Sequence, residues 1–598
     1  MAKKVKKAPE KKEASSFERL IEVGISLSAE RDTDRLMETI LLEAKDLSKA
    51  DGGTLYLKTE DDTLKFEIVR TDSLKIAMGG TTGKEITFPP VLLYDPETGK
   101  ENKSNVASCA ALTGESINIP DAYDSKDFDF TGTRKFDEGT GYRSKSFLTV
   151  PMKNSMDEII GVLQLLNAKD LETGEVIPFG DDIQPLIEAL ASQAAVALDN
   201  KQLLDAQKFL LDSFIELIAS AIDAKSPYTG GHCQRVPELT KMLAQAACDA
   251  KEGPFADFDL TEDEWYELHI AAWLHDCGKV TTPEYVVDKA TKLETIYDRI
   301  HEIRTRFEVV KREAEIEYLK AVGEGNGDEE KLRAELDDRL AKLDDDFGFI
   351  AESNIGGEFM APERIERVNE IANIKWTRTL DDRIGLSHEE KKRKDRTPAP
   401  ELPVVENLLS DRDDHIIYRE DEPVTTKDDK FGFKLDVPER KFDLGEIYNL
   451  CIARGTLTEE ERFKINDHIV QTIVMLGQLP FPEHLKRVPE YAGGHHEKMD
   501  GTGYPRKLNK DQMSIPARIM AIADIFEALT AADRPYKSPK TLSTSVKIMS
   551  FMEKDAHIDE DLFKLFLTSG VYKDYADRFL DDEQNDDVDI NDYLKGDD

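Results

Sequence analysis

A long apolar stripe without chain breaks divides this sequence into two parts. Between residues 181 and 225, hydrophobic side chains recur near helical spacing and almost no proline or glycine interrupts them. The stripe consists of Ile183, Leu186, Ile187, Leu190, Ala194, Leu198, Leu203, Leu204, Leu210 and Leu211. We therefore expect a helix that connects an N-terminal domain to a C-terminal one. Such a stripe can pack back on its own domain, but its position between two domains favours pairing in a parallel homodimer.

Length and charge limit what the two parts can be. A chain of 598 residues exceeds one hydrophobic core and predicts roughly two to four domains of about 150 residues each. The net charge of −41 disfavours binding to a nucleic acid polymer, so any phosphate must be held locally. The basic start "MAKKVKKAPEKKEASS" lacks the apolar run of a secretory signal, and no later segment reaches the length of a membrane span. Five cysteines without a CxxC pair argue against disulfides. Together these features lead us to expect a cytoplasmic protein without a membrane partner.

The N-terminal part mixes helical and strand-like segments. A helical stretch begins at residue 16, and "GGTLYLK", "LKFEIVR", "SFLTVPM" and "IIGVLQLLNA" are strand-like, which predicts an α+β domain. The segment resembles a GAF domain, a small-molecule sensing module. Its "RKFDE" at 134–138 is similar to the NKFDE signature of GAF domains that bind cyclic nucleotides, with Arg134 in place of asparagine. The resemblance implies a small-molecule or cyclic-nucleotide ligand near Lys135, Phe136 and Asp137. Alternatively, Lys135 and Asp137 form an ion pair that ties down a loop, with Phe136 as its hydrophobic plug.

Four motifs in the C-terminal part carry histidines and acids within apolar, helical surroundings. They are "YTGGHCQRV", "AAWLHDCGKV", "HHEKMDGTGYP" and "IMAIADIFEALTAADRPYK". One buried histidine is more often a hydrogen-bonded core residue than a ligand. Several buried histidines and acids together cost much free energy unless they satisfy one another, and shared metal ions do this. The combination predicts a metal centre.

Two of these motifs resemble those of the HD-GYP family of metal-dependent phosphohydrolases. "HDCGK" matches the HD element and "HHEKMDGTGYP" the GYP element. Between them the family has a histidine eleven residues after the leucine of an "LT" dipeptide. His468 stands eleven residues after Leu457, whereas His301 stands eight after Leu293, so we assign the ligand to His468. We expect His301 to lie on a helix surface. Four residues after His468, where the family often has glycine, this chain has Thr472.

This assignment requires an insertion in the catalytic domain at about residues 290–450. Apolar residues spaced by three and four occur on both sides of "GEGNGD", which predicts an antiparallel helical hairpin. They are Ile296, Ile300, Ile303, Phe307, Val310 and Ala314, then Leu332, Leu336, Leu340, Leu343 and Phe347. The following "HEEKKRKDRTPAPELP" is charged and proline-rich and predicts an exposed connection.

The predicted fold is multidomain. It comprises a basic tail (1–15), an α+β GAF-like domain (16–175), a connecting helix (176–210), an all-α HD-GYP domain with a large helical insertion (211–575) and an acidic tail (576–598).

The family resemblance also implies the site residues. His232, His275, Asp276 and Asp524 would hold one ion, and Asp276, His468 and His495 the other, with Asp276 as the bridge and His496 lining the pocket. Lys279 follows on the same helix and would touch the scissile phosphate. The expected substrate-binding residues are Lys279, Gly501, Gly503, Tyr504, Arg534 and Lys537. The two glycines let the backbone approach the substrate closely, and the Tyr504 ring offers it a flat surface.

The implied reaction is hydrolysis of cyclic di-GMP to pGpG, and sometimes to GMP, with two divalent ions. Mixed imidazole and carboxylate ligands suit iron or manganese. Some relatives of this kind hold a third ion through a glutamate four residues before His232. Tyr228 takes that place here, so we expect two ions with His496 outside their coordination, unless Glu497 fills the gap. Alternatives are hydrolysis of another nucleotide or cyclic dinucleotide, and a non-catalytic receptor, against which the complete ligand set argues.

Overall fold

The computed structural model describes residues 16–30, 32–225, 231–357, 359–420, 423, 429–531 and 539–594. These residues form two compact units, which meet between Leu211 and Asp212. In the described part of the chain, no helix combines the length and apolar character that a membrane crossing requires.

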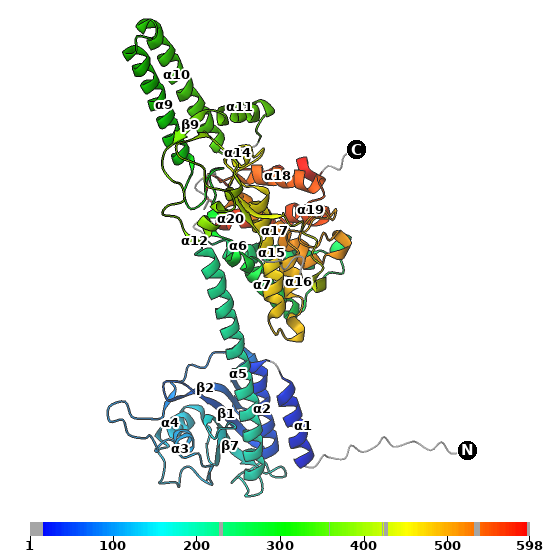
Figure 1. Cartoon of the computed structure of the whole chain (residues 1–598). Helices are drawn as coiled ribbons and strands as arrows, with labels where there is room; N and C mark the ends of the chain where they lie inside the picture. Colours follow the sequence, from blue (N-terminus) through cyan, green and yellow to red (C-terminus); the bar gives the residue numbers. More distant parts are fainter. Residues whose placement is uncertain are drawn as a thin grey trace, which may run out of the picture. The chain divides into compact units, whose positions relative to one another are not determined.

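The N-terminal unit is an antiparallel sheet with helices on both faces, which confirms the predicted α+β fold (Figure 1). The strand order is β3-β2-β1-β7-β6-β5, with β4 paired to β2 and β8 to β7. The strands are β1 (Ala50–Lys58), β2 (Thr63–Thr71), β3 (Ile76–Gly79), β4 (Val91–Leu92), β5 (Ile117–Ile119), β6 (Phe147–Lys153), β7 (Ile159–Lys169) and β8 (Val176–Ile177). Leu55 packs in the core beneath α1 (Ser16–Ala29), α2 (Thr33–Ser48) and α5 (Gln184–Asp223). Its neighbour Tyr56 faces α3 (Val106–Thr113), as the alternation along a strand requires.

Helix α5 divides the apolar stripe into segments with different surroundings. Leu190 and Leu198, in its first half, are buried against the sheet, so this half packs back on its own domain. Further along, Leu204 and Phe209 are 62% and 74% exposed. Ile215, Ala219 and Ile222, near the end of the helix, join the core of the second unit. The helix begins later and ends later than the predicted 176–210.

The second unit is built on helices, several of which begin with a polar capping residue. Thr458 caps α15 (Glu459–Gln478) in a capping box with Glu461, and Ser514 caps α17 (Ile515–Thr530). The other main helices are α6 (His232–Asp249), α7 (Glu262–Leu274), α8 (Glu284–Val287), α16 (Val488–Gly493), α18 (Leu542–Lys554), α19 (Glu560–Thr568), α20 (Val571–Phe579) and α21 (Asn591–Leu594). Residues 576–594, expected as part of an acidic tail, pack on this core, and buried Gln584 donates to the carbonyls of Thr530 and Lys540 at 2.9 and 3.0 Å.

The insertion has a hydrophobic core of its own. The predicted hairpin is confirmed as α9 (Ile300–Gly323) and α10 (Glu329–Asn354), side by side in Figure 1, although Ile296 lies outside it and is 90% exposed. The insertion is not wholly helical. It also contains two two-stranded ladders, β9 (Lys375–Arg378) with β10 (Val404–Asn407) and β11 (Ile416–Tyr418) with β12 (Arg440–Asp443). Its remaining helices are α11 (Pro362–Ala372), α12 (His388–Lys394) and α14 (Glu446–Leu450).

The charged segment 388–403 is mostly exposed, as predicted, but it also contains a short helix and one buried residue. It begins with α12, and Lys394 at the end of this helix is buried between Asp382 and Asp414, at 2.8 and 3.0 Å. This one buried residue was not predicted, because the acidic partners of Lys394 are distant in sequence and local composition does not reveal them.

Candidate metal centre

Two clusters of ligand-type side chains lie in the second unit. The first contains His232, His275, Asp276 and Asp524, and the second contains His468, His495 and His496. Within each cluster the ligand atoms lie within 4.8 Å of one another. The structure therefore brings together the six side chains predicted as ligands and His496, which was expected to line the pocket, from five separate segments of the chain.

Asp276 joins the two clusters. Its Oδ2 lies 3.2 Å from Nε2 of both His232 and His275, whereas its Oδ1 lies 3.3 Å from Nε2 of His468. Asp524 Oδ1 faces the first cluster, 3.4 Å from His232 Nε2. The carboxylate of Asp276 thus has the position that a bridge between two cations requires.

Hydrogen bonds fix the orientation of the histidine rings. Nδ1 of His275, His468 and His495 each bonds the carbonyl oxygen three residues earlier, at 2.8, 2.6 and 2.7 Å. Because Nδ1–H is the donor, Nε2 of each ring is directed into the cluster, and in the neutral ring it carries the lone pair.

The resulting acceptors fit cations. Nε2 of His232, His275 and His495, and Oδ1 of Asp276, are buried and have no hydrogen-bond partner among the described residues. Buried acceptors without partners are costly, and divalent cations satisfy such a set of nitrogens and oxygens. The arrangement fits metal ions better than it fits an ordinary polar core.

The electrostatics of the clusters keep the acids charged and two of the imidazoles neutral. Burial alone would raise the pKa of Asp276, but the nearby Lys279 and His275 hold it well below its usual range. Burial and the neighbouring His275 lower the pKa of His495 to about 4. Burial and His495 similarly lower the pKa of His496. Anionic carboxylate and neutral imidazole are the forms that bind metal ions.

Comparison with known proteins agrees with this architecture. A family model described as HD domain matches residues 403–562, and one described as GAF domain matches residues 32–198. The chain contains a GAF domain and an HD domain. The HD match includes His468 and Asp524, whereas His232 and His275 precede it, on the other side of the insertion.

The curated relatives resemble part of this chain. A 3'3'-cGAMP-specific phosphodiesterase of Vibrio cholerae serotype O1 is 38% identical over 128 residues, which are 21% of this chain and 29% of the relative. A probable cyclic di-GMP phosphodiesterase of the same organism is 31% identical over 155 residues, which are 24% of this chain and 34% of the relative. A cyclic di-GMP phosphodiesterase of Pseudomonas aeruginosa is 39% identical over 79 residues, which are 13% of this chain and 18% of the relative. The chain thus spans about a third or less of the length of these relatives.

Sequence reasoning missed a pair of residues behind His232 in the HD domain. Glu527 is buried on α17 and bonds His232 Nδ1, and it also accepts a 2.7 Å hydrogen bond from Nε of Arg235. Burial opposes ionisation of Glu527, but His232 and Arg235 lower its pKa. The signal was present in the sequence, because Glu527 and Arg235 each follow a predicted ligand by three residues on a helix.

Lys279 lies at the centre, although not on the helix that was expected. Helix α7 ends at Leu274, and Lys279 belongs to the 3-10 turn η3 (Cys277–Thr281). Its Nζ lies 2.5 Å from Asp276 Oδ2, and its side chain is 30% exposed. The change of helix type directs Lys279 back to the Asp276 carboxylate.

The turn η3 packs closely against α15. A Cβ on Gly278 would lie 1.9 Å from the carbonyl oxygen of His468, so no other residue fits there without a shift. The Gly278 amide donates to Thr472 Oγ1 at 2.9 Å. Thr472, a departure from the family pattern, therefore helps to hold the two clusters together.

The glycines of the loop after the histidine pair are required by the conformation of the loop itself. A Cβ on Gly503 would lie 2.3 Å from the Lys498 amide nitrogen, so this glycine lets the loop approach itself closely. Gly501 has a φ of +79°, which favours glycine. The Tyr504 ring stacks on His496, with centroids 4.9 Å apart, so one face of it is already covered.

The structure also gives the positions of the two side chains beside His495. His496 Nε2 lies 3.2 Å from His468 Nε2, so His496 is a neighbour of the ligand-type side chains in the second cluster. The two carboxylate oxygens of Glu497 accept from the amides of Arg506 and Leu508 at 2.6 and 2.8 Å, and Glu497 is in neither cluster. Tyr228, Arg534 and Lys537 lie outside the described residues.

His301 is exposed on α9, and its Nδ1 contacts Nη1 of Arg304 at 2.7 Å, which confirms the surface position predicted for it.

In the GAF domain, the "RKFDE" segment lies on α4 (Thr131–Thr140). Asp137 is buried and accepts from Ser144 N and Oγ, both at 2.8 Å, and from the Tyr123 hydroxyl at 2.9 Å. Lys135 is exposed, and within the described residues no ion pair joins it to Asp137. Phe136 is 38% exposed, so the hydrophobic plug was a wrong prediction. The motif does secure the following loop, but through Ser144.

Proposed function

We propose that the HD domain is a metal-dependent phosphodiesterase that hydrolyses a cyclic dinucleotide, with cyclic di-GMP as substrate and pGpG as main product. The observation that carries this proposal is the pair of adjoining clusters joined by Asp276, with unpartnered, buried Nε2 atoms directed into them. The names of the relatives support the same reaction class.

In this proposal the first cluster holds one divalent ion and the second holds another, with Asp276 contributing to both. The first set consists of His232, His275, Asp276 and Asp524, and the second of Asp276, His468, His495 and His496. Iron or manganese suits these mixed ligands. Two such ions supply a water of lowered pKa and stabilise charge on the phosphodiester under attack.

The residues of the chain position the substrate phosphate. Lys279 is the cation closest to Asp276, and its partly exposed ammonium can exchange that carboxylate for a phosphate oxygen. Tyr504 holds the His496 ring in place by stacking. Because the whole chain carries a net charge of −41, this local positive charge is the attraction available to an anionic substrate.

A second substrate has support of its own. The Vibrio cholerae relatives named as 3'3'-cGAMP-specific are 38% and 41% identical to this chain over the segments they share with it. The alternative is therefore that 3'3'-cGAMP is hydrolysed in preference to cyclic di-GMP.

The test combines metal analysis with product identification. Full-length protein loaded with iron or manganese is incubated with cyclic di-GMP and 3'3'-cGAMP in parallel, and products are separated by chromatography. We expect about two metal equivalents per chain and a linear dinucleotide product. Metal-loaded protein that binds either compound but leaves both intact identifies a receptor instead.

We also propose that the GAF domain regulates this activity through a homodimer. The support is the run of exposed apolar side chains in the middle of α5, which includes Leu203, Leu204, Phe209 and Leu210. A parallel pair of such helices buries this surface and can transmit a change of register or rotation.

A further inference from the structure

A cavity of about 510 Å³ lies within the insertion. It is bounded by α9, the β9–β10 ladder, η4 (Asp413–His415) and α14. This volume falls within the range of roughly 300–1,000 Å³ that is typical of small-molecule sites. The cavity is far larger than the space that a single small ion or water fills.

Most of the charges that line the cavity are already paired with one another. Arg306 forms a two-pronged ion pair with Glu446, and Arg378 forms one with Glu406 at 2.8 and 3.1 Å. Glu446 also accepts from the Ser410 amide at 3.0 Å. These pairs hold the wall in a fixed geometry, which lowers the cost of binding a ligand.

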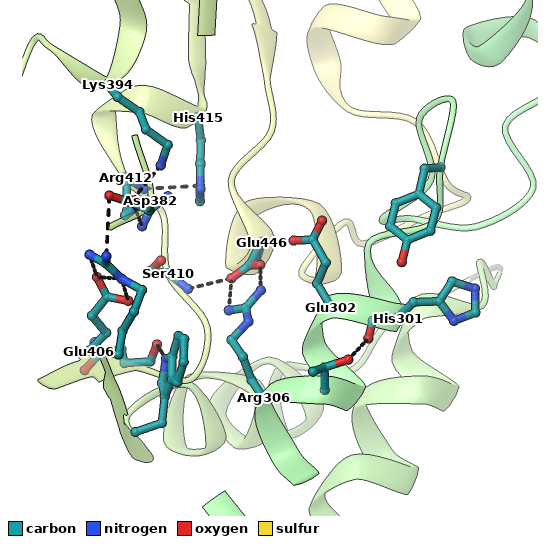
Figure 2. A pocket seen from close by; sticks show the side chains of 15 residues that line it. His301, Glu302, Arg306, Asp382, Lys394, Glu406, Ser410, Arg412, His415 and Glu446 are labelled. Carbon is teal, nitrogen blue, oxygen red and sulfur yellow. Dashed lines mark hydrogen bonds and ion pairs between the residues drawn. The ribbon is translucent and has the colours of Figure 1, made fainter. Parts of the chain in front are cut away.

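One side of the cavity retains unused hydrogen-bond donors. The guanidinium of Arg412 contacts Asp414 at 3.0 Å and Asp382 at 3.7 Å, whereas its Nε has no partner in the described part of the chain. Nδ1 of His415 accepts from the Arg412 amide at 3.4 Å, so the proton of the neutral ring is on Nε2. The hydroxyl of Ser410 also has no partner among the described residues. Figure 2 shows Ser410, Arg412 and His415 together on this side, separated from His301 by Arg306 and Glu446. Three donors on one side suit an anionic group such as a phosphate.

The other side offers an unpaired carboxylate. Glu302 on α9 has no ion-pair partner among the described residues, and Figure 2 shows it beside Glu446. A carboxylate with two free oxygens accepts two adjacent N–H donors, which is the pattern of the guanine edge.

The lining also includes aromatic surfaces. Trp376 is held in place by an indole N–H bond of 3.2 Å to the Asn407 carbonyl. Tyr297 is half exposed and lies against His301, with ring centroids 5.5 Å apart. A planar base stacks favourably on such rings.

We propose that this cavity is a binding site for a guanosine monophosphate, with the phosphate at Ser410, Arg412 and His415, and the guanine edge at Glu302. The base stacks on Trp376. The site is separate from the metal centre and does not depend on catalysis. Adenine binds less well, because its corresponding edge presents one donor and one acceptor, and the acceptor faces the carboxylate.

The test is titration calorimetry and tryptophan fluorescence on the full chain, with GMP, AMP, guanosine and inorganic phosphate as probes. We expect GMP to bind at least tenfold more tightly than any other probe and to quench fluorescence. Trp376 is one of three tryptophans, and Trp376→Phe keeps a stacking surface while removing the indole. This variant should still bind GMP but lose most of the quenching.

Variants then locate the two ends of the ligand. Arg412→Met and His415→Ala should each weaken GMP binding at least tenfold, and circular dichroism verifies that they fold. Glu302→Gln changes an exposed side chain and should reduce the preference for GMP over AMP. Lys392→Met, on the exposed face of α12, should bind like the wild type.

Asp276→Asn separates this site from the proposed function. It should remove hydrolysis and leave GMP binding at the cavity unchanged. Wild-type affinity in Arg412→Met and His415→Ala, or quenching that persists in Trp376→Phe, would overturn the proposal. Loss of GMP binding in Asp276→Asn alone would place the ligand at the metal centre and also overturn it.

Discussion

The ammonium of Lys289 lies 2.9 and 2.8 Å from the two carboxylate oxygens of Glu461. Both side chains are buried, and Lys289 also contacts the Asn449 side-chain oxygen at 3.3 Å. Glu461 completes the capping box of α15, the helix that carries His468. Lys289, which follows α8, therefore connects the start of a metal-centre helix, through its ion pair with Glu461, to α14 of the insertion, through its hydrogen bond to Asn449.

Lys289→Met should destabilise the protein strongly, because it leaves the Glu461 carboxylate buried without its partner. We expect the free energy of unfolding to fall by about 3–5 kcal/mol. Urea unfolding followed by circular dichroism measures this change. Lys564→Met breaks an exposed pair with Glu560 and should cost less than about 1 kcal/mol. Equal losses in the two variants would mean that the buried pair has no special importance.

The second prediction concerns the choice between two histidines. His468→Ala should reduce bound metal and remove hydrolysis, since His468 Nε2 lies 3.3 Å from Asp276 Oδ1. His301→Ala should change neither, because His301 is exposed and contacts Arg304. Elemental analysis and product chromatography on both variants measure these effects. Comparable metal loss in the two variants would contradict the assignment.

Some features of the metal centre could be predicted from the sequence, and others could not. Spacing identified His468, because a motif within one helix preserves its own register. The same reasoning placed Lys279 on a continuous helix, whereas the chain turns into η3 after Leu274. Motif spacing cannot show such a change, since it results from the packing of Gly278 against α15.

The interior of the insertion was less predictable. Helical periodicity found α9 and α10, because long apolar stripes are a strong local signal. The short strands β9 and β10 pair across an intervening segment of the chain, and Lys394 meets Asp414 twenty residues later. Pairing between distant segments leaves no periodic pattern in either one.

The third prediction concerns Glu527, the buried carboxylate that bonds Nδ1 of His232. Glu527→Gln keeps the shape of the side chain but removes the charge that bonds His232 Nδ1 and Arg235. Because such partners fix the orientation of a metal-binding ring, we expect metal affinity to fall roughly 10- to 100-fold. Competition with a chelator measures the affinity. Glu560→Gln, on the exposed face of α19, serves as the control and should bind metal like the wild type.

The fourth prediction concerns pH and His415. Burial and the nearby Arg412 lower the pKa of His415 from 6.5 to about 4. The unfolded chain then binds this proton at a higher pH than the folded chain does. The contribution of His415 to stability is thus present above pH 6.5 and is lost as pH falls towards 4.

Between pH 7 and pH 5 this loss amounts to about 2 kcal/mol. His415→Gln should remove that part of the pH dependence and leave the rest. Urea unfolding of the wild type and the variant at both pH values measures it. If the free energy of unfolding of the variant falls between pH 7 and pH 5 by as much as that of the wild type, the prediction is contradicted.

The last prediction concerns the exposed middle of α5. Leu204 and Phe209 are 62% and 74% exposed, although neighbouring stretches of the same helix are buried in the cores of the two units. A run of exposed apolar side chains along one helix is removed from water when a second copy of that helix packs against it. We expect a dimer at micromolar concentration in analytical ultracentrifugation. Phe209→Glu should shift it to monomer, because two copies bring the introduced charges together in an apolar interface. Lys201→Glu alters charge on the same helix without removing an apolar side chain and should remain dimeric. A monomeric wild-type chain at this concentration would rule out the dimer, and regulation by the GAF domain would then have to act within one chain.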